Sequence, residues 1–161
     1  MGRQLRDRDD LGGVTPSRRP AEVRFYVDAD LLGLAKILVT VRSDVTYPGD
    51  PGGEIFRRLR PCCPITDPST LDRDWLPRVA AANWLILTRD RKIQSHRAEI
   101  AAVRDHGARL ITLSSDDAKT KFAQLEIVMC RWRDIEQKLA LPGPFIYRAT
   151  RTQLTVVNLD G

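Results

Sequence analysis

The chain has 161 residues, of which 42% are hydrophobic and 29% are charged, and its net charge is +5. This composition is typical of a single soluble globular domain and excludes a wholly disordered chain. No apolar run is long enough to span a membrane, and the first residues lack the apolar stretch of a secretory signal. We therefore expect a cytoplasmic protein with a basic surface that suits a polyanionic partner such as RNA.

The first half of the chain contains two predicted strands and one clear helix. Residues 1–22 lack periodicity and are rich in Arg, Asp, Gly and Pro, which predicts a flexible arm. Short β-branched and aromatic runs predict strands over 23–28 and 44–47. Apolar residues at helical spacing predict a helix over 29–42, and we expect one or two helical turns over 54–60.

The second half shows stronger patterns. Fully apolar runs predict buried strands over 84–88 and 108–113. Helices are expected before, between and after these strands, and the last of them ends at the Pro-Gly-Pro of 142–144. The remaining segments, FIYRAT and QLTVVNL, predict a hairpin around Arg151 and Thr152.

This alternation of strands and helices indicates an α/β fold. We expect a three-layer sandwich in which helices cover both faces of a mainly parallel central sheet. The predicted domain covers residues 23–141, and residues 142–161 form a C-terminal extension. In such sheets ligands bind beyond the carboxyl ends of the strands, so the functional residues are expected there.

Acidic residues follow the predicted strands at this edge. Asp28 ends the first strand and Asp90 follows the strand over 84–88, while Asp30, Asp72 and Asp74 lie near the starts of helices. Carboxylates placed close together repel one another and therefore require a cation between them. Oxygen ligands at this density favour Mg²⁺ or Mn²⁺, which activate water and stabilise the charge of a phosphodiester displacement.

The same acids have a structural interpretation as helix N-caps. It applies to Asp30, Asp72 and Asp74, and it is the favoured one for Asp116 and Asp117. For Asp28 and Asp90 the catalytic or metal-binding interpretation is favoured, because each ends a buried strand. Because the three cysteines and two histidines have no metal-binding or triad spacing, the chemistry is expected to rest on carboxylates.

A resemblance to a known family is carried by RFYVDADLLGLAKIL and by DRDWLPRVAAANWLILTRDRKI. These segments resemble the PIN-like nucleases, particularly their VapC-type toxin branch, over residues 24–113. The resemblance implies a Mg²⁺- or Mn²⁺-dependent ribonuclease, often a toxin neutralised by a partner antitoxin. Asp28, Asp74 and Asp90 then correspond to the family's acids, and Thr88 to the threonine of its last motif.

Other residues complete the site that the resemblance implies. The family's second acid on the helix after Asp28 has no obvious counterpart, and Asp30 or Glu99 is expected to take its place, with Asp72 as a further auxiliary ligand. Thr88 would orient a metal-bound water or a ligand carboxylate through its hydroxyl. The basic residues that flank Asp90 are expected to hold phosphates of the RNA; they are Arg89, Arg91 and Lys92.

Two alternatives remain open. Asp28-Ala29-Asp30 also matches the paired acids of haloacid-dehalogenase-like phosphatases, although no Thr or Val follows the pair. The missing helix acid permits a non-catalytic module that binds RNA or a protein partner. Separately, Met129, Cys130 and Trp132 on the last helix predict an interface for an antitoxin or a homodimer mate, with a core role for Trp132 as the alternative.

Overall fold

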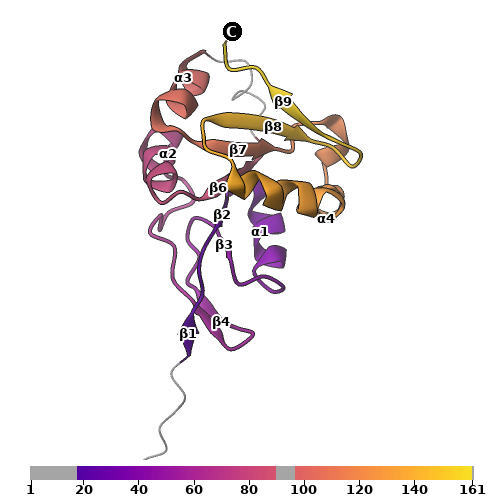
Figure 1. Ribbon diagram of the computed structural model, residues 1–161. Helices are drawn as coiled ribbons and strands as arrows, with labels where there is room; N and C mark the ends of the chain where they lie inside the picture. Colours follow the sequence, from indigo (N-terminus) through magenta and orange to yellow (C-terminus); the bar gives the residue numbers. More distant parts are fainter. Residues whose placement is uncertain (1–17, 90–96, 161) are drawn as a thin grey trace, which may run out of the picture.

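The computed structural model describes residues 18–89 and 97–160 and has an α/β fold (Figure 1). Its main sheet has six strands in the order β3-β2-β6-β7-β8-β9. They are β2 (Phe25–Val27), β3 (Val45–Thr46), β6 (Leu85–Thr88), β7 (Arg109–Thr112), β8 (Phe145–Ala149) and β9 (Leu154–Val157). Neighbouring strands are parallel except β8 and β9, which form the antiparallel hairpin at the end of the chain. The predicted mainly parallel sheet is therefore confirmed.

Helices cover both faces of this sheet (Figure 1). Helices α1 (Leu32–Leu38) and α4 (Lys121–Gln137) share one core with the sheet, and α2 (Asp72–Ala81) and α3 (Arg97–His106) share the other. Side chains alternate along a strand, so Phe25 and Val27 of β2 join the first core and Tyr26 joins the second. The structure is a three-layer sandwich, and no helix of its described residues is long and apolar enough to cross a membrane.

A second, smaller sheet replaces the helical turns expected over 54–60. Strands β4 (Gly53–Ile55) and β5 (Arg58–Arg60) form a hairpin, and β1 (Arg19–Pro20) pairs with β5 in parallel. Short helices have little stability of their own. Here the pairing with β1 and a buried ion pair between Arg60 and Asp50 favour the extended conformation instead. Residues 18–22 consequently belong to the folded structure and not to an arm.

The helix starts differ from the predicted N-caps. Helix α2 begins at Asp72 with Leu71 in the N-cap position, so Asp72 and Asp74 lie in its first turn. There, carboxylates interact favourably with the helix dipole, but they do not cap the helix.

The acids before the last long helix also lie inside a turn. Ser115 occupies the N-cap position of η3 (Asp116–Ala118), and the N-cap of α4 is Thr120, whose hydroxyl accepts the N–H of Ala123 at 3.1 Å. The N-cap role predicted for Asp116 and Asp117 was therefore wrong. The 3₁₀ turn between the strand and α4, which the sequence pattern did not reveal, separates them from the helix start. A second 3₁₀ turn, η4 (Lys138–Ala140), follows α4.

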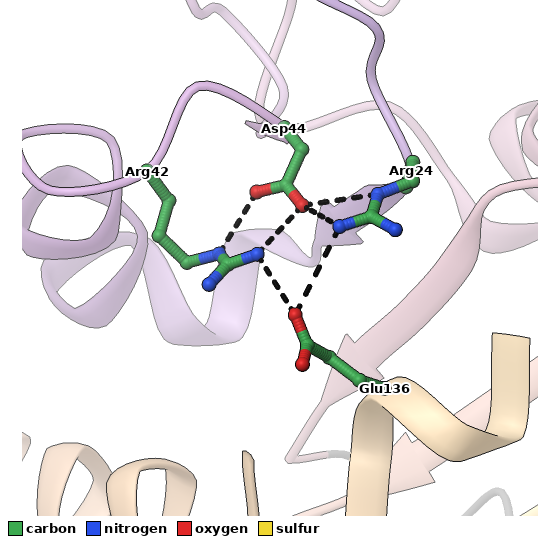
Figure 2. Close-up of polar contacts among 4 residues, drawn as sticks. All are labelled: Arg24, Arg42, Asp44 and Glu136. Carbon is green, nitrogen blue, oxygen red and sulfur yellow. Dashed lines mark hydrogen bonds and ion pairs between the residues drawn. The ribbon is translucent and has the colours of Figure 1, made fainter. Parts of the chain in front are cut away.

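Helix α4 is tied to the amino-terminal edge of the sheet by ion pairs (Figure 2). Asp44 lies between two arginines, 2.7 Å from Arg24 and 2.8 Å from Arg42, and Arg42 also contacts Glu136 of α4 at 3.1 Å. The guanidinium of Arg42 lies 4.4 Å from the ring centroid of Trp132. These contacts join residues that are far apart in the sequence.

Trp132 has a largely structural position. Its ring centroid lies 4.8 Å from that of Phe25, and the side chain packs against the core shared with α1. Met129, in contrast, is 70% exposed, and Cys130 is exposed. Of the two roles weighed for Trp132, the structure supports the core role.

Candidate active site

Asp28 lies at the carboxyl-terminal edge of the sheet, directly after β2. Its backbone N–H donates to the carbonyl of Leu87 at 2.9 Å and so continues the parallel pairing of β2 with β6. The side chain is 7% exposed, and its Oδ1 accepts the N–H of Ala29 at 2.6 Å. Asp28 is thereby the N-cap of the short turn η1 (Ala29–Leu31). The sequence analysis disfavoured a capping role for Asp28. In the structure Asp28 caps η1 and also lies at the ligand-binding edge.

Asp28, Asp30 and Thr88 converge at this edge. The buried hydroxyl of Thr88 lies 3.1 Å from Oδ2 of Asp28 and 3.3 Å from Oδ2 of Asp30. The same oxygen of Asp30 accepts the backbone N–H of Arg89 at 3.1 Å. The start of η1 and the end of β6 thus bring two carboxylates to one hydroxyl, although about sixty residues separate them in sequence.

This environment disfavours the ionised form of Asp28. Burial is the largest cause that raises its pKa, followed by the charge of Asp30, and the charge of Asp72 adds to both. Hydrogen bonds from Ala29 and Thr88 act in the opposite direction but do not offset these effects, and the pKa is about 7. A nearby cation would reverse this balance by favouring the carboxylate.

The acids of α2 and α3 occupy different positions around this point. Asp72 acts electrostatically on Asp28, and its Oδ1 accepts the indole N–H of Trp75 at 3.0 Å. Asp74 lies two positions further, about 200° around the helix, and is exposed. Glu99 of α3 and Asp72 both line a cleft of about 580 Å³ between α2 and α3. Asp72 therefore both lines this cleft and acts on the charge of Asp28.

Three predicted site residues, Asp90, Arg91 and Lys92, lie outside the described residues. Among residues 18–89 and 97–160, no three His, Cys, Asp or Glu side chains are grouped so that they could hold a metal ion. The described part of the site supplies the carboxylate oxygens of Asp28 and Asp30. These are the hard donors that Mg²⁺ and Mn²⁺ prefer, and a fuller ligand set requires a further donor.

Thr112 and Arg148 extend the row of polar residues, and the sequence analysis missed both. Thr112 ends β7 in register with Thr88, and Arg148 of β8 is in register with Thr112. The hydroxyl of Thr112 is buried and has no hydrogen-bond partner among the described residues. The signal was present in the sequence, because LILT and RLIT both end a buried strand with threonine.

Tyr26 brings a second unexpected hydroxyl to this side of the sheet. The group is buried without a hydrogen-bond partner among the described residues, and the ring lies 5.0 Å from that of Trp75. Burial, and then the charges of Asp28, Cys63 and Asp72, raise the pKa of Tyr26. A tyrosine in an apolar strand looks like an ordinary core residue, so the sequence held no signal for this position.

Comparison with known proteins supports the interpretation of this edge. A protein-family model described as a PIN like domain matches residues 23–115, which is more than half of the chain. The match begins just before β2 and ends after β7, and so contains Asp28, Asp30, Asp72 and Thr88. No curated protein and no solved structure matches the chain. The family match and the three-layer fold together show that the chain belongs to the PIN-like domain family, whose members are typically nucleases.

Proposed function

We propose that this protein is a metal-dependent endoribonuclease that hydrolyses phosphodiester bonds of RNA. The observation that carries the proposal is the convergence of Asp28 and Asp30 on Thr88 at the carboxyl edge of a PIN-like sheet. The net charge of +5 suits a polyanionic substrate. Haloacid-dehalogenase-like chemistry would use the same Asp28 and Asp30, but the family match favours the nuclease.

Mg²⁺ or Mn²⁺ is the proposed cofactor. The raised pKa of Asp28 fits this proposal, because two neighbouring carboxylates without a cation disfavour each other's ionised forms. Asp28 and Asp30 would hold the ion together with Asp90. A bound ion would supply an activated water and neutralise charge on the phosphate. From the sequence, Asp74 was the third acid expected to hold the ion beside Asp28 and Asp90, and the expected auxiliary ligands were Asp30, Asp72 and Glu99.

The protein's own groups have separate proposed tasks. Thr88 orients the carboxylates of Asp28 and Asp30 through its hydroxyl. Arg89, Arg91 and Lys92 contact phosphates of the substrate, which positions RNA without selecting its sequence. Because Asp72 acts on Asp28 from α2, we prefer it to Asp74 as the acid of this helix that assists the site.

The test is cleavage of a fluorescently labelled RNA. Activity should require Mg²⁺ or Mn²⁺, stop in EDTA, and fall by orders of magnitude in Asp28→Asn and Asp90→Asn. Asp72→Asn should reduce the rate more than Asp74→Asn, which serves as the matched control on the same helix. If cleavage continues in EDTA, or if Asp28→Asn and Asp90→Asn cut as fast as the parent, the carboxylate–metal proposal is wrong.

We further propose that the protein is the toxin of a toxin–antitoxin pair, with a protein antitoxin as its partner. The support is the resemblance of the segments around Asp28 and Asp90 to the VapC-type branch. Controlled expression in a bacterial host should arrest growth, whereas Asp28→Asn expressed at the same level should not. Growth arrest by both chains would contradict an RNase toxin.

We also propose that the protein forms a homodimer through α4. Its support is the exposed side chain of Met129 on this helix. Sedimentation at increasing concentration should show a dimer that Met129→Glu disrupts. A parent chain that remains monomeric at high concentration would contradict this proposal.

A further inference from the structure

The tip of the β4–β5 hairpin is aromatic and basic. Phe56 is 71% exposed there, and Arg57 and Arg58 follow it directly. Neither arginine has an ion-pair partner within the described part of the chain. With β1, the hairpin lies at one end of the molecule, away from α2, α3 and α4 (Figure 1). Two cations without an ion-pair partner among the described residues and an exposed aromatic ring therefore share one protruding element.

The backbone at this tip adopts an uncommon conformation. The two loop residues, Phe56 and Arg57, have φ values of 49° and 60°, in the left-handed region. Hairpins with two such residues normally use Asn-Gly, because side chains with a bulky Cβ are disfavoured there. The side chain of Phe56, which is 71% exposed, gains little burial that would offset this strain. Strain that yields no packing is typical of functional positions.

The base of the hairpin is held firmly against the main sheet. Arg60 of β5 is 6% exposed and donates to Asp50 and to the carbonyl of Val45 at the start of β3. The hydroxyl of Thr46 also contacts Asp50, at 3.2 Å. The hairpin therefore has a fixed direction relative to the sheet, and its tip is presented in one place.

A cavity lies between the tip and the amino-terminal edge of the sheet. Its volume is about 390 Å³, within the range of small-ligand sites. The hairpin contributes Phe56 and Arg58 to its lining, and the sheet edge contributes Arg24, Arg42 and Ser43. Two acids, Glu22 and Asp44, also line the cavity. Asp44 forms ion pairs with Arg24 and Arg42. The unpaired cation of this lining, within the described residues, is Arg58.

We propose that the β4–β5 hairpin is a binding arm for single-stranded RNA. A base stacks on Phe56, and Arg57 and Arg58 contact the neighbouring phosphates. An exposed aromatic ring can stack only on a base that is not already stacked within a duplex, so a single strand is the form recognised. The identification of the nucleic acid as RNA rests on the proposed function.

The arm and the acidic site lie at opposite edges of the sheet. Arg24 precedes β2 and lines the cavity, whereas Asp28 follows β2, so about 13 Å of strand separates their positions. An RNA of several nucleotides could contact both edges. The arm would therefore add affinity for longer substrates without taking part in cleavage.

The test measures RNA binding in a chain that does not cut. In Asp28→Asn with EDTA, fluorescence anisotropy with a labelled 12-nucleotide single strand should show binding. Phe56→Ala should weaken it by about 5- to 150-fold, the range found for base-stacking aromatics. Arg57→Gln and Arg58→Gln should each lower the slope of log affinity against log salt by about 0.7.

Matched controls come from α4. Phe122 is 74% exposed and Arg133 is exposed, so Phe122→Ala and Arg133→Gln remove similar groups from another surface. Both should leave RNA affinity unchanged. Equal losses in the control and hairpin variants would overturn the arm, because they would indicate nonspecific attraction.

A second variant separates a structural from a binding role of the tip. Phe56→Asn combined with Arg57→Gly installs the preferred Asn-Gly loop and should raise the melting temperature while weakening RNA binding. RNA affinity that is unchanged in all the hairpin variants overturns the proposal and points to a protein partner. If cleavage by the parent chain is intact, only the arm fails. If Phe56-dependent binding is present without cleavage, only the proposed function fails.

Discussion

At the scale of single residues, two effects on the charge of Asp28 oppose each other. Its Oδ1 accepts the N–H of Ala29 and so stabilises the start of η1, but its burial beside Asp30 disfavours the charge. The native state therefore holds a proton on this carboxyl at pH values where the unfolded chain has released it. A raised carboxyl pKa of this kind is expected where acidic side chains form an ion-binding site without a cation.

The first prediction is a loss of stability with rising pH. The pKa of Asp28 is about 7 in the folded state against 3.8 for the ordinary side chain, so the folded state binds more protons between these values. Stability in EDTA should consequently fall between about pH 4 and pH 7. Asp28→Asn, which resembles the protonated side chain, should remove this decline and exceed the parent at pH 8 by up to a few kcal/mol.

Thermal unfolding across this pH range checks the first prediction. At pH 4 the two chains should have similar stability, and Mn²⁺ at pH 8 should stabilise the parent more than the variant. A parent whose stability is flat between pH 4 and pH 8 would contradict the raised pKa.

The second prediction compares two threonines that are neighbours in register. Thr88→Val removes the hydroxyl that contacts Asp28 and Asp30, and should cost about 1–3 kcal/mol at pH 8. Thr112→Val removes a buried hydroxyl without a partner among the described residues, so its effect should be within about 0.5 kcal/mol or stabilising. Urea unfolding of the parent and both variants measures these changes in the free energy of unfolding. Equal destabilisation would show that Thr112 also has an essential hydrogen bond.

At the scale of elements, the β4–β5 hairpin shows how a buried ion pair selects local structure. Arg60 and Asp50 are 6% and 2% exposed, and their contacts include the carbonyl of Val45 and the N–H of Gly52. Neither charge could be buried alone, because an isolated ion in the interior is strongly disfavoured. The extended conformation of β5 allows Arg60 to reach Asp50.

The third prediction concerns this pair. Arg60→Met should destabilise the chain by about 3–5 kcal/mol, because Asp50 would remain buried without its cation. Adding Asp50→Asn should recover much of the loss, since the uncompensated charge is then removed. Urea unfolding of the parent, the two single variants and the double variant measures the coupling. Losses that simply add would contradict a specific buried pair.

At the scale of the whole molecule, Asp44 connects the two halves of the chain. Arg24 and Arg42 flank it, and Arg42 continues the network to Glu136 of α4 (Figure 2). Burial alone would raise the pKa of Asp44, but the hydrogen bonds and charges of the two arginines outweigh it and lower the pKa. The network therefore stabilises the ionised form and holds the last long helix against the sheet.

The fourth prediction follows from the lowered pKa of Asp44. Its contribution to stability is present above the ordinary pKa of 3.8 and is lost as the pH falls through the lower folded value. Asp44→Asn should therefore cost about 1–3 kcal/mol at pH 7, and the difference should shrink as the pH falls below 3.8. Glu126→Gln is the control, because its pair with Arg151 is exposed and should contribute less than about 1 kcal/mol. A difference that stays constant from pH 7 down to pH 2 would contradict the prediction.

The residue pattern alone was sufficient for the class of fold and for the edge where the acids lie. A buried strand requires a run of apolar residues and an amphipathic helix requires helical spacing, and both patterns are local. WLILT and ARLITL therefore predicted β6 and β7, and the position of Asp28 after the first strand placed it at the carboxyl edge. Asp30 was recognisable by the same argument, whereas Thr88 was identified through the resemblance to the PIN-like nucleases.

Only the tertiary structure decided which side chains meet. Whether Asp72 or Asp74 acts on Asp28 depends on the rotation of α2 against the sheet, which the spacing of apolar residues defines only approximately. The extended form of residues 53–60 depends on Asp50 and on β1, which lie outside the segment itself. Contacts between residues that are distant in the sequence are determined by the packing of the complete chain. A local pattern of residues therefore cannot predict them.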